Sequence, residues 1–108
     1  MNDRILSLLG LATKAGSVVS GEFQVDKAVK DGKAYLVIVA KDASANTHKE
    51  FRDMCSYYRV PFYEYATKEE LGHGIGKEER ASVAVTGEGF AKSLIKLLDS
   101  NNDGHQIS

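Results

Sequence analysis

VVSGEFQVDKAVKDGKAYLVIVAKDAS, residues 18–44, decides the fold of this chain. A short β-rich segment runs into Gly21, a polar helix is predicted over about residues 22–31, and an apolar run fills residues 34–40. An apolar run of this length is typical of a strand that is buried on both faces, with helices packed on either side. We therefore predict an α/β fold, a three-layer α-β-α sandwich around a mixed four-stranded sheet.

The other elements follow from periodicity and from capping residues. Further helices are predicted over about residues 3–15, 45–58, 67–71 and 88–98, and further strands over about residues 60–65 and 82–86. Thr67 and Glu70 form a capping box, and Gly72 is expected to end that helix after a single turn. The helix over residues 45–58 carries an apolar stripe of Phe51, Met54, Cys55 and Tyr58.

Length and composition describe one ordinary domain of 108 residues, which is 43% hydrophobic and has a net charge of −1. We expect a single domain over residues 1–99 and a flexible polar tail over residues 100–108. The balanced charge excludes a strongly basic nucleic-acid-binding protein, so any binding of RNA or DNA would have to come from a local patch. A single cysteine and the lack of a membrane-spanning run predict a cytoplasmic protein, which we expect to be a monomer.

Catalytic signals are weak. His48, His73 and His105 have no metal-ligand spacing, and His48 is interpreted as a partly buried packing residue. Cys55 lies within the apolar stripe and is predicted to be an inert core thiol. The glutamate pairs at 69–70 and 78–79 are typical of solvated surface. We therefore predict no catalytic residues, no metal and no cofactor.

A glycine-rich segment, GHGIGK at residues 72–77, leaves three interpretations open. A phosphate-binding P-loop needs Ser or Thr after the lysine, where this chain has Glu78. The glycines equally serve a tight turn. In the third interpretation Ile75, Lys77 and Arg80 form a contact surface, which adjoins the helix over residues 22–31 if the strands at Val18 and Val83 lie together.

Three segments together carry a family resemblance: residues 20–29 (SGEFQVDKAV), residues 34–43 (AYLVIVAKDA) and residues 60–77. Over about residues 5–98 the chain resembles the ribosomal protein L7Ae/L30e family of kink-turn RNA-binding proteins, most closely its small bacterial YlxQ-type members. The resemblance implies that a helix-opening motif, Gly-x-Asn-Glu-x-x-Lys, reads sheared G·A pairs at an RNA kink. Gly21 and Lys27 match this motif, whereas Phe23 and Gln24 stand at its Asn and Glu positions.

The RNA-binding residues that the resemblance implies are Gly21, Glu22, Phe23, Gln24, Lys27, Lys41, Gly76, Lys77, Glu78 and Arg80. The favoured prediction is a non-catalytic protein that recognises kink-turn-like ribosomal or regulatory RNA, with RNA as its partner and ribosomal proteins as neighbours. Gln24 would contact base edges, and Lys27 and Lys41 would contact phosphates. The alternative is a ribosome-associated protein-interaction module with weak RNA affinity, anchored by Phe23. The lysines can also be read as a solvated helix face in which Lys27 pairs with Asp31.

Overall fold

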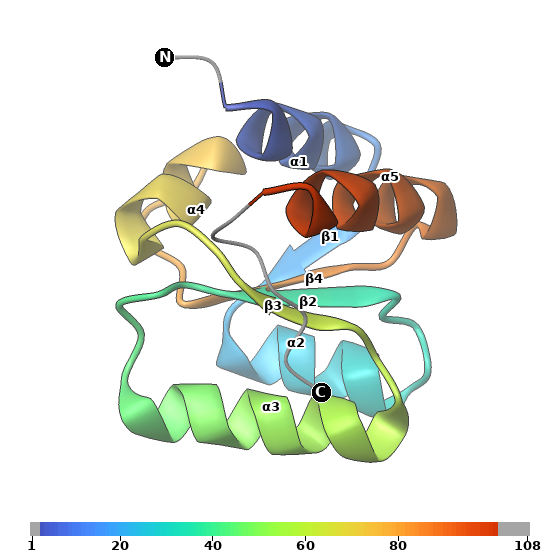
Figure 1. Cartoon of the computed structure of the whole chain (residues 1–108), viewed down its shortest axis with the longest axis vertical. Helices are drawn as coiled ribbons and strands as arrows, with labels where there is room; N and C mark the ends of the chain where they lie inside the picture. Colours follow the sequence, from blue (N-terminus) through green and yellow to red (C-terminus); the bar gives the residue numbers. More distant parts are fainter. Residues whose placement is uncertain (1–2, 102–108) are drawn as a thin grey trace.

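The computed structural model describes residues 3–101, which form five helices and four strands in the predicted order (Figure 1). The helices are α1 (Arg4–Lys14), α2 (Glu22–Lys30), α3 (Ala45–Tyr58), α4 (Lys68–Gly74) and α5 (Glu88–Asp99). The strands are β1 (Val18–Ser20), β2 (Leu36–Val39), β3 (Phe62–Glu64) and β4 (Ser82–Val85). None of the helices within residues 3–101 is long and apolar enough to cross a membrane.

The four strands form one mixed sheet in the order β1-β4-β2-β3, in which only β2 and β3 run parallel. Every residue of β2 is buried, which confirms the prediction of a strand covered on both faces. The register pairs Ser20 with Val83, and Val39 with both Ser82 and Glu64. The C-terminal ends of β1, β2 and β3 therefore lie beside the first residues of β4, at one end of the sheet. We call this end, where the chain continues into Gly21 after β1, the Gly21 edge.

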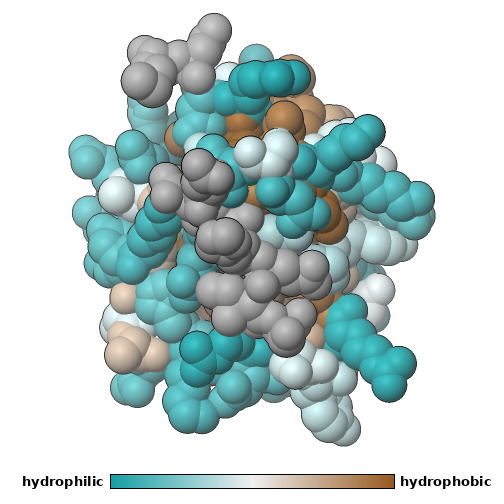
Figure 2. All heavy atoms as spheres, viewed as in Figure 1, coloured by the Kyte–Doolittle hydropathy of each residue, from teal (hydrophilic) through white to brown (hydrophobic). Residues whose placement is uncertain are grey.

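Helices cover both faces of the sheet, as expected for a three-layer sandwich. Figure 1 shows α1, α4 and α5 on one face and α2 and α3 on the other. Leu9, Leu71 and Leu94 belong to the hydrophobic core of the first face, and Phe51 and Cys55 to that of the second. The surface seen in Figure 2 is predominantly hydrophilic over α3 and α4, with hydrophobic side chains gathered near α1 and α5.

Two predictions about side chains in α3 have different outcomes. Cys55 is fully buried, and this burial raises the pKa of its thiol to about 12, as expected for an inert core cysteine. The prediction that Tyr58 belongs to the buried apolar stripe is wrong, because 42% of this residue is exposed. Its ring packs edge-on against the ring of Tyr57 in the last turn of the helix, with the ring centres 4.9 Å apart.

The predicted end of the helix at Gly72 is also wrong. Thr67 and Glu70 form the expected capping box, but α4 continues through Gly72 to Gly74. Gly72 is buried, and a Cβ built on it would lie 1.7 Å from the carbonyl oxygen of Glu78. Glycine is thus required here by the close approach of another backbone segment rather than by the end of a helix.

The ends of the described region are held by side-chain hydrogen bonds. Asp3 caps α1 by accepting a hydrogen bond from the backbone N–H of Leu6 at 3.0 Å, and its other carboxylate oxygen accepts one from the Tyr65 hydroxyl at 2.7 Å. At the other end the Ser100 hydroxyl lies 3.1 Å from the carbonyl oxygens of Lys96 and Leu97 in the last turn of α5, to which it can donate. Beyond residue 101, the predicted flexible tail lies outside the described residues.

Candidate nucleic-acid interface

The chain turns from β1 into α2 at Gly21, whose backbone conformation favours glycine. Its φ of 92° and ψ of 154° lie in a region that residues with a side chain rarely adopt. The Gly21 N–H donates to the carbonyl oxygen of Ser82 at 3.0 Å, which fixes the turn against β4. Among the described residues, no side chain caps α2. The N–H groups of its first turn therefore remain available to an acceptor from outside.

The first turn of α2 presents its side chains to solvent. Glu22, Phe23 and Gln24 are exposed, and 75% of Phe23 is accessible. Val25 and Val29 lie on the opposite side of the helix and are buried in the core. This division follows from the helical period, because residues three and four apart share a face. The exposed aromatic ring and the side-chain amide are thus held on a helix that is firmly packed against the sheet.

Arg80 reaches the same place from the other half of the chain. Its guanidinium Nε donates to the Ser20 Oγ at 3.1 Å, and its Nη1 donates to the carbonyl oxygen of Glu79 at 2.8 Å. Its backbone N–H donates to the carbonyl oxygen of Lys68 at 3.0 Å. The pairing of β1 with β4 therefore brings the opening of α2 beside the end of the glycine-rich segment, as the sequence predicted on condition that these strands lie together.

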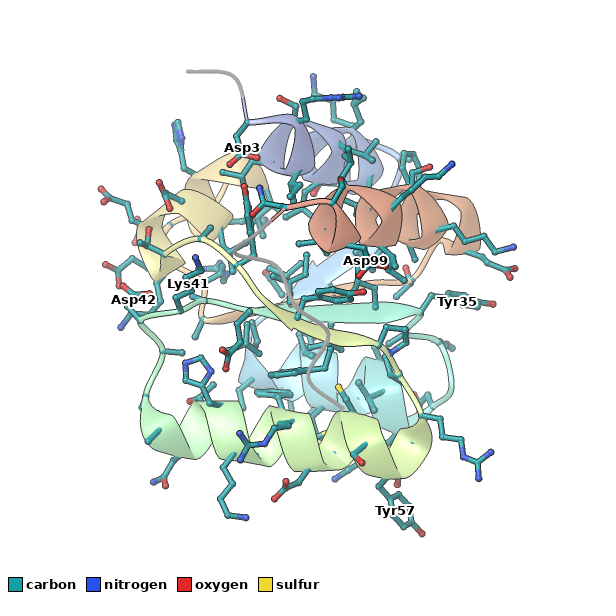
Figure 3. All side chains as sticks on the ribbon, in the orientation of Figure 1. Asp3, Tyr35, Lys41, Asp42, Tyr57 and Asp99 are labelled. Atoms are coloured by element: carbon teal, nitrogen blue, oxygen red, sulfur yellow. The ribbon has the colours of Figure 1, made fainter. Side chains whose placement is uncertain are left out.

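Lys41 and Asp42 complete the Gly21 edge where β2 ends (Figure 3). The backbone N–H of Lys41 donates to the carbonyl oxygen of Ala66 at 2.8 Å. The carboxylate of Asp42 accepts a hydrogen bond from the backbone N–H of Lys68 at 2.8 Å, so it helps to cap α4. Lys41 is exposed, and its backbone is fixed by the hydrogen bond to Ala66.

Gly76, Lys77 and Glu78 lie on the α4 side of this edge. The Lys77 N–H donates to the carbonyl oxygen of Gly72 at 2.8 Å, and the Glu78 carbonyl packs against that glycine. Gly76 lines a hollow between α1 and α4. Of the three, the hydrogen bond of Lys77 and the packing contact of Glu78 run to α4 rather than to α2. The three residues border the edge, and within residues 3–101 none of them makes a hydrogen bond with Ser20 or Gly21.

The positive charges on α2 are partly compensated. Lys27 pairs with Asp31 at 2.9 Å and Lys30 pairs with Asp26 at 3.2 Å, one helical turn apart in each case. The hydrogen bond and charge of Lys27 lower the pKa of Asp31. Because these pairs are exposed, they stabilise the fold little and can exchange partners. The predicted pairing of Lys27 with Asp31 is therefore confirmed, and Lys27 remains accessible to a phosphate.

Two carboxyl groups, those of Glu22 on α2 and Glu50 on α3, lie close together at the first turn of α2. Burial, together with the neighbouring charge and hydrogen bond of Glu22, raises the pKa of Glu50 on α3. Asp26 adds a smaller effect in the same direction. The negative charge of Glu22 and Glu50 disfavours the binding of a phosphate directly beside them.

The glycine-rich segment does not form a phosphate site of the P-loop kind. A hollow of about 730 Å³ between α1 and α4 is lined by Asp3, Glu69, Glu70 and His73, among others. Its carboxylates repel an anion, and the glycine-rich segment leads from α4 into β4 rather than from a strand into a helix as a P-loop does. Within residues 3–101, no three His, Cys, Asp or Glu side chains converge in a way that would hold a metal ion.

Three residues that shape the Gly21 edge were missed or misjudged from the sequence. The Ser20 hydroxyl accepts a hydrogen bond from the Arg80 guanidinium, and the Asp42 carboxylate caps α4. The ring of His48 lies between the Lys41 carbonyl and the Glu64 carboxylate. His48 is partly buried as predicted, but it also bridges two strand ends. Its partner Glu64 is distant in sequence and on a different element, so no local pattern identifies the contact.

The fold and this edge define a known class of α/β protein. The chain belongs to the ribosomal protein L7Ae/L30e/S12e/Gadd45 family, which it matches over residues 3–95. This confirms the resemblance found in the sequence. It is 51% identical over 92 residues to the RNA-binding protein YlxQ of Bacillus subtilis (strain 168), a match that covers 85% of this chain and 92% of that protein. The RNA-binding protein YlxQ of Enterococcus faecium is 36% identical over 96 residues, which cover 89% and 92% of the two chains.

Solved structures share the same architecture. A protein of unknown function from Bacillus halodurans C matches with a TM-score of 0.88 and 41% identity, over 91% of this chain and 99% of that chain. The Giardia lamblia 15.5kD RNA binding protein matches with a TM-score of 0.75 and 20% identity, over 93% and 92%. The second likeness, at such low identity, concerns the fold alone.

Proposed function

We propose that this chain is a non-catalytic RNA-binding protein that recognises kink-turn-like structured RNA with its Gly21 edge. The observation that carries this proposal is the position of Arg80 beside Ser20 and Gly21, at the uncapped opening of α2. One exposed surface thereby combines backbone donors, a side-chain amide, an aromatic ring and cations. The two relatives named as RNA-binding proteins support it.

Each group on this surface has a chemical role in such recognition. Gly21 carries no side chain, so an RNA backbone can approach the N–H groups of the first turn closely. Gln24 offers both a donor and an acceptor to a base edge, and Phe23 offers a ring for an unstacked base. Cationic side chains at the two ends of the surface, those of Lys27 and Lys41, hold phosphates, while Gly76, Lys77 and Glu78 border the kink.

The balanced charge of the protein fits recognition of shape. A net charge of −1 gives no general attraction to RNA, and the lysines of α2 are paired with aspartates. A few base-edge contacts to a distorted stem supply specificity without a large positive field. The expected behaviour is preference for a preformed kink and weak binding to regular duplexes. We further propose that the protein acts as a cytoplasmic monomer with ribosomal proteins as neighbours.

A second candidate function is a protein-interaction module on the ribosome, and the 75% exposure of Phe23 favours it. Aromatic anchors of this kind dominate many protein interfaces. Salt separates the two functions, because phosphate contacts release counterions and weaken steeply as salt rises, whereas burial of a ring does not. Kink-turn affinity that stays constant between about 50 and 200 mM salt would favour the second function.

Lys27 gives a direct test, with Lys92 as its matched control. Both lysines are exposed and pair with a carboxylate one turn away, but Lys92 lies on α5, near the opposite end of the sheet. In a fluorescence titration with a kink-turn RNA, Lys27→Ala should weaken binding by about 1–3 kcal/mol. Lys92→Ala should leave it unchanged. Equal affinities for both variants would remove Lys27 from the interface.

A further inference from the structure

We infer that a groove at the end of the sheet opposite to the Gly21 edge binds one unpaired nucleotide of RNA. We call it the Arg59 groove, and the residues that line it include Tyr35, Arg59, Pro61, Glu88, Lys92 and Ile95. The inference rests on the proposed function for its choice of RNA as the ligand. It adds a second contact surface that lies outside the Gly-x-x-x-x-x-Lys motif.

The sheet topology brings four segments together at this groove. β2 begins just after Tyr35, and β3, which runs parallel to β2, begins just after Pro61. Arg59 follows the last residue of α3, and α5 begins at Glu88, shortly after β4 ends beside the beginning of β2. Figure 3 shows Tyr35 at the opposite side of the molecule from Lys41. The groove and the Gly21 edge therefore lie at opposite ends of the strands.

The size and lining of the groove fit one flat ring. Its volume of about 260 Å³ is just below the roughly 300–1,000 Å³ of pockets that hold whole drug-sized ligands. Pro61 and Ile95 belong to its apolar walls, and Tyr35, which is 43% exposed, adds an aromatic face. The Tyr35 N–H donates to the carbonyl oxygen of Val85 at 2.8 Å, so the backbone beneath the ring is fixed. A nucleobase of any sequence has a flat face that can stack on such a ring.

The charge of the groove favours an anion. Among the described residues that line it, the carboxylate is that of Glu88, which pairs with Lys92 at 3.6 Å. Within residues 3–101, the Arg59 guanidinium makes no hydrogen bond or ion pair, so its charge is not compensated. A guanidinium stays charged, and its planar set of donors matches the oxygens of a phosphate. An apolar, aromatic groove beside an unpaired guanidinium is complementary to a base and its phosphate together.

The backbone of Arg59 is an independent observation. This residue ends α3 in the left-handed conformation, with a φ of 60° and a ψ of 44°. Helices commonly end on glycine in this conformation, because glycine has no Cβ that would clash. The helix dipole favours a cation here, but an arginine in the last helical turn would gain this without the strain. A strained residue whose side chain lines a groove is typical of a binding site.

One RNA molecule can reach both surfaces of the protein. The structure extends over 34 × 27 × 26 Å. At about 3.4 Å per nucleotide of a helical strand, about ten nucleotides span the longest of these dimensions. A single strand of that length that leaves a kinked stem at the Gly21 edge can place an unpaired nucleotide in the Arg59 groove. The groove thereby adds affinity for RNAs that carry such an extension.

The experiment titrates the protein into a fluorescein-labelled single-stranded oligouridine of about ten nucleotides, followed by fluorescence anisotropy. Tyr35→Ala removes the stacking ring and should weaken binding about 5- to 150-fold. The matched control is Tyr57→Ala, which should bind as the wild type does. Tyr57 is 80% exposed on α3, and Figure 3 shows it pointing away from the sheet. No binding by the wild type, or equal affinities of the two variants, would overturn the inference.

Arg59→Gly separates the role of the side chain from that of the fold. Glycine adopts the conformation of this position without strain, so the variant should remain folded in circular dichroism. Loss of one phosphate contact to a single strand should reduce the slope of log affinity against log salt by about 0.7. Arg52→Ala, which removes another exposed arginine of α3, should keep the wild-type slope. An unchanged slope for Arg59→Gly would refute the phosphate contact.

Two further measurements locate the ligand and test its chemistry. In nuclear magnetic resonance spectra, the amide signals of Tyr35, Arg59 and Ile95 should shift when the oligouridine is added. Shifts confined to the Gly21 edge would overturn the inference. A glutamate peptide of the same net charge has no flat rings and should bind more weakly. Equal binding of the peptide would show that the groove attracts any anion and would overturn its assignment to a nucleotide.

A kink-turn duplex without a single-stranded extension separates this inference from the proposed function. Tyr35→Ala and Arg59→Gly should bind this duplex as tightly as the wild type, because it is held at the Gly21 edge alone. Weaker binding of the duplex by both variants would contradict two separate surfaces. If the wild type does not bind the duplex at all, the proposed function fails, and the oligouridine titration still decides whether the Arg59 groove takes a nucleotide.

Discussion

Replacement of Gly72 by alanine tests how tightly the glycine-rich segment is folded onto α4. An ideal Cβ at this position would lie 1.7 Å from the carbonyl oxygen and 2.5 Å from the carbonyl carbon of Glu78, and 3.0 Å from the Cα of Glu79. All three are backbone atoms, so no side-chain rotation can relieve the overlap. The Lys77 N–H also donates to the Gly72 carbonyl at 2.8 Å, which holds the segment where the new methyl group would be.

The expected loss of stability follows from these distances. Ordinary contact begins at 3.4 Å, so the Glu78 carbonyl has to retreat from 1.7 Å to at least that separation. Forced shifts of this kind cost about 1–3 kcal/mol, and loss of the Lys77 hydrogen bond costs about 1 kcal/mol more. The higher helix propensity of alanine returns about 1 kcal/mol. We therefore expect Gly72→Ala to lower the free energy of unfolding by about 1–3 kcal/mol.

Urea denaturation followed by circular dichroism measures this loss, and Gly74→Ala is the matched control in the same helix. At Gly74 the nearest atom to a new Cβ is the Leu6 Cδ2 at 3.4 Å, an ordinary contact. That variant should be unchanged or stabilised by up to about 1 kcal/mol. Equal stability of the two variants would contradict the packing described here. Displacement of the segment should also move Arg80, so Gly72→Ala should bind kink-turn RNA more weakly than Gly74→Ala.

Further predictions concern the ends of α1, α5 and β1. Asp3→Ala removes the cap of α1 and the acceptor of the Tyr65 hydroxyl, so it should destabilise the protein by about 1–3 kcal/mol in urea denaturation, whereas Asp3→Asn should retain most of the cap. Burial, and then the hydrogen bond to Asp99, raises the pKa of Tyr63 above its ordinary 10.0. The stability that depends on the neutral hydroxyl is therefore present below pH 10.0 and is lost as the pH rises beyond it. In thermal unfolding between about pH 9 and 11, Tyr63→Phe should show a smaller fall in stability than the wild type. Gly21→Ala meets no atom within 4 Å but forces an alanine to φ 92°, so it should cost about 1–3 kcal/mol of stability, and a variant as stable as the wild type would show that the turn relaxes freely.

Much of the fold can be predicted from the sequence because its signals are local. The apolar run that contains β2, the period of α2 and the capping box of α4 each indicate their element within a few residues. The errors occur where a distant segment decides. Gly72 looks like a helix terminus in sequence, but it is a point where the segment at Glu78 crosses α4. Tyr58 has the spacing of a core residue, but it lies in the last turn of α3, where its ring packs on Tyr57.

Less of the candidate site than of the fold can be predicted from the sequence. The pairing of Lys27 with Asp31 follows from helical spacing and is confirmed. Arg80 and Ser20 are 60 positions apart in sequence, and their contact depends on the pairing of β1 with β4, which no local pattern specifies. The bridge from His48 to Glu64 likewise needs α3 to pack on β3. Non-local pairing of this kind is a property of the sheet topology and appears only when the whole chain is folded.

A competition gel shift with two RNA duplexes of equal length tests the RNA-binding proposal most directly. One duplex contains a kink-turn, the other is fully paired, and both are titrated with the wild-type protein at the same salt concentration. The proposal predicts that the kinked duplex binds at least about 1000-fold more tightly, the lower end of the usual ratio of specific to non-specific nucleic-acid affinity. Equal binding of the two duplexes, or binding of neither, would contradict the role proposed for the Gly21 edge.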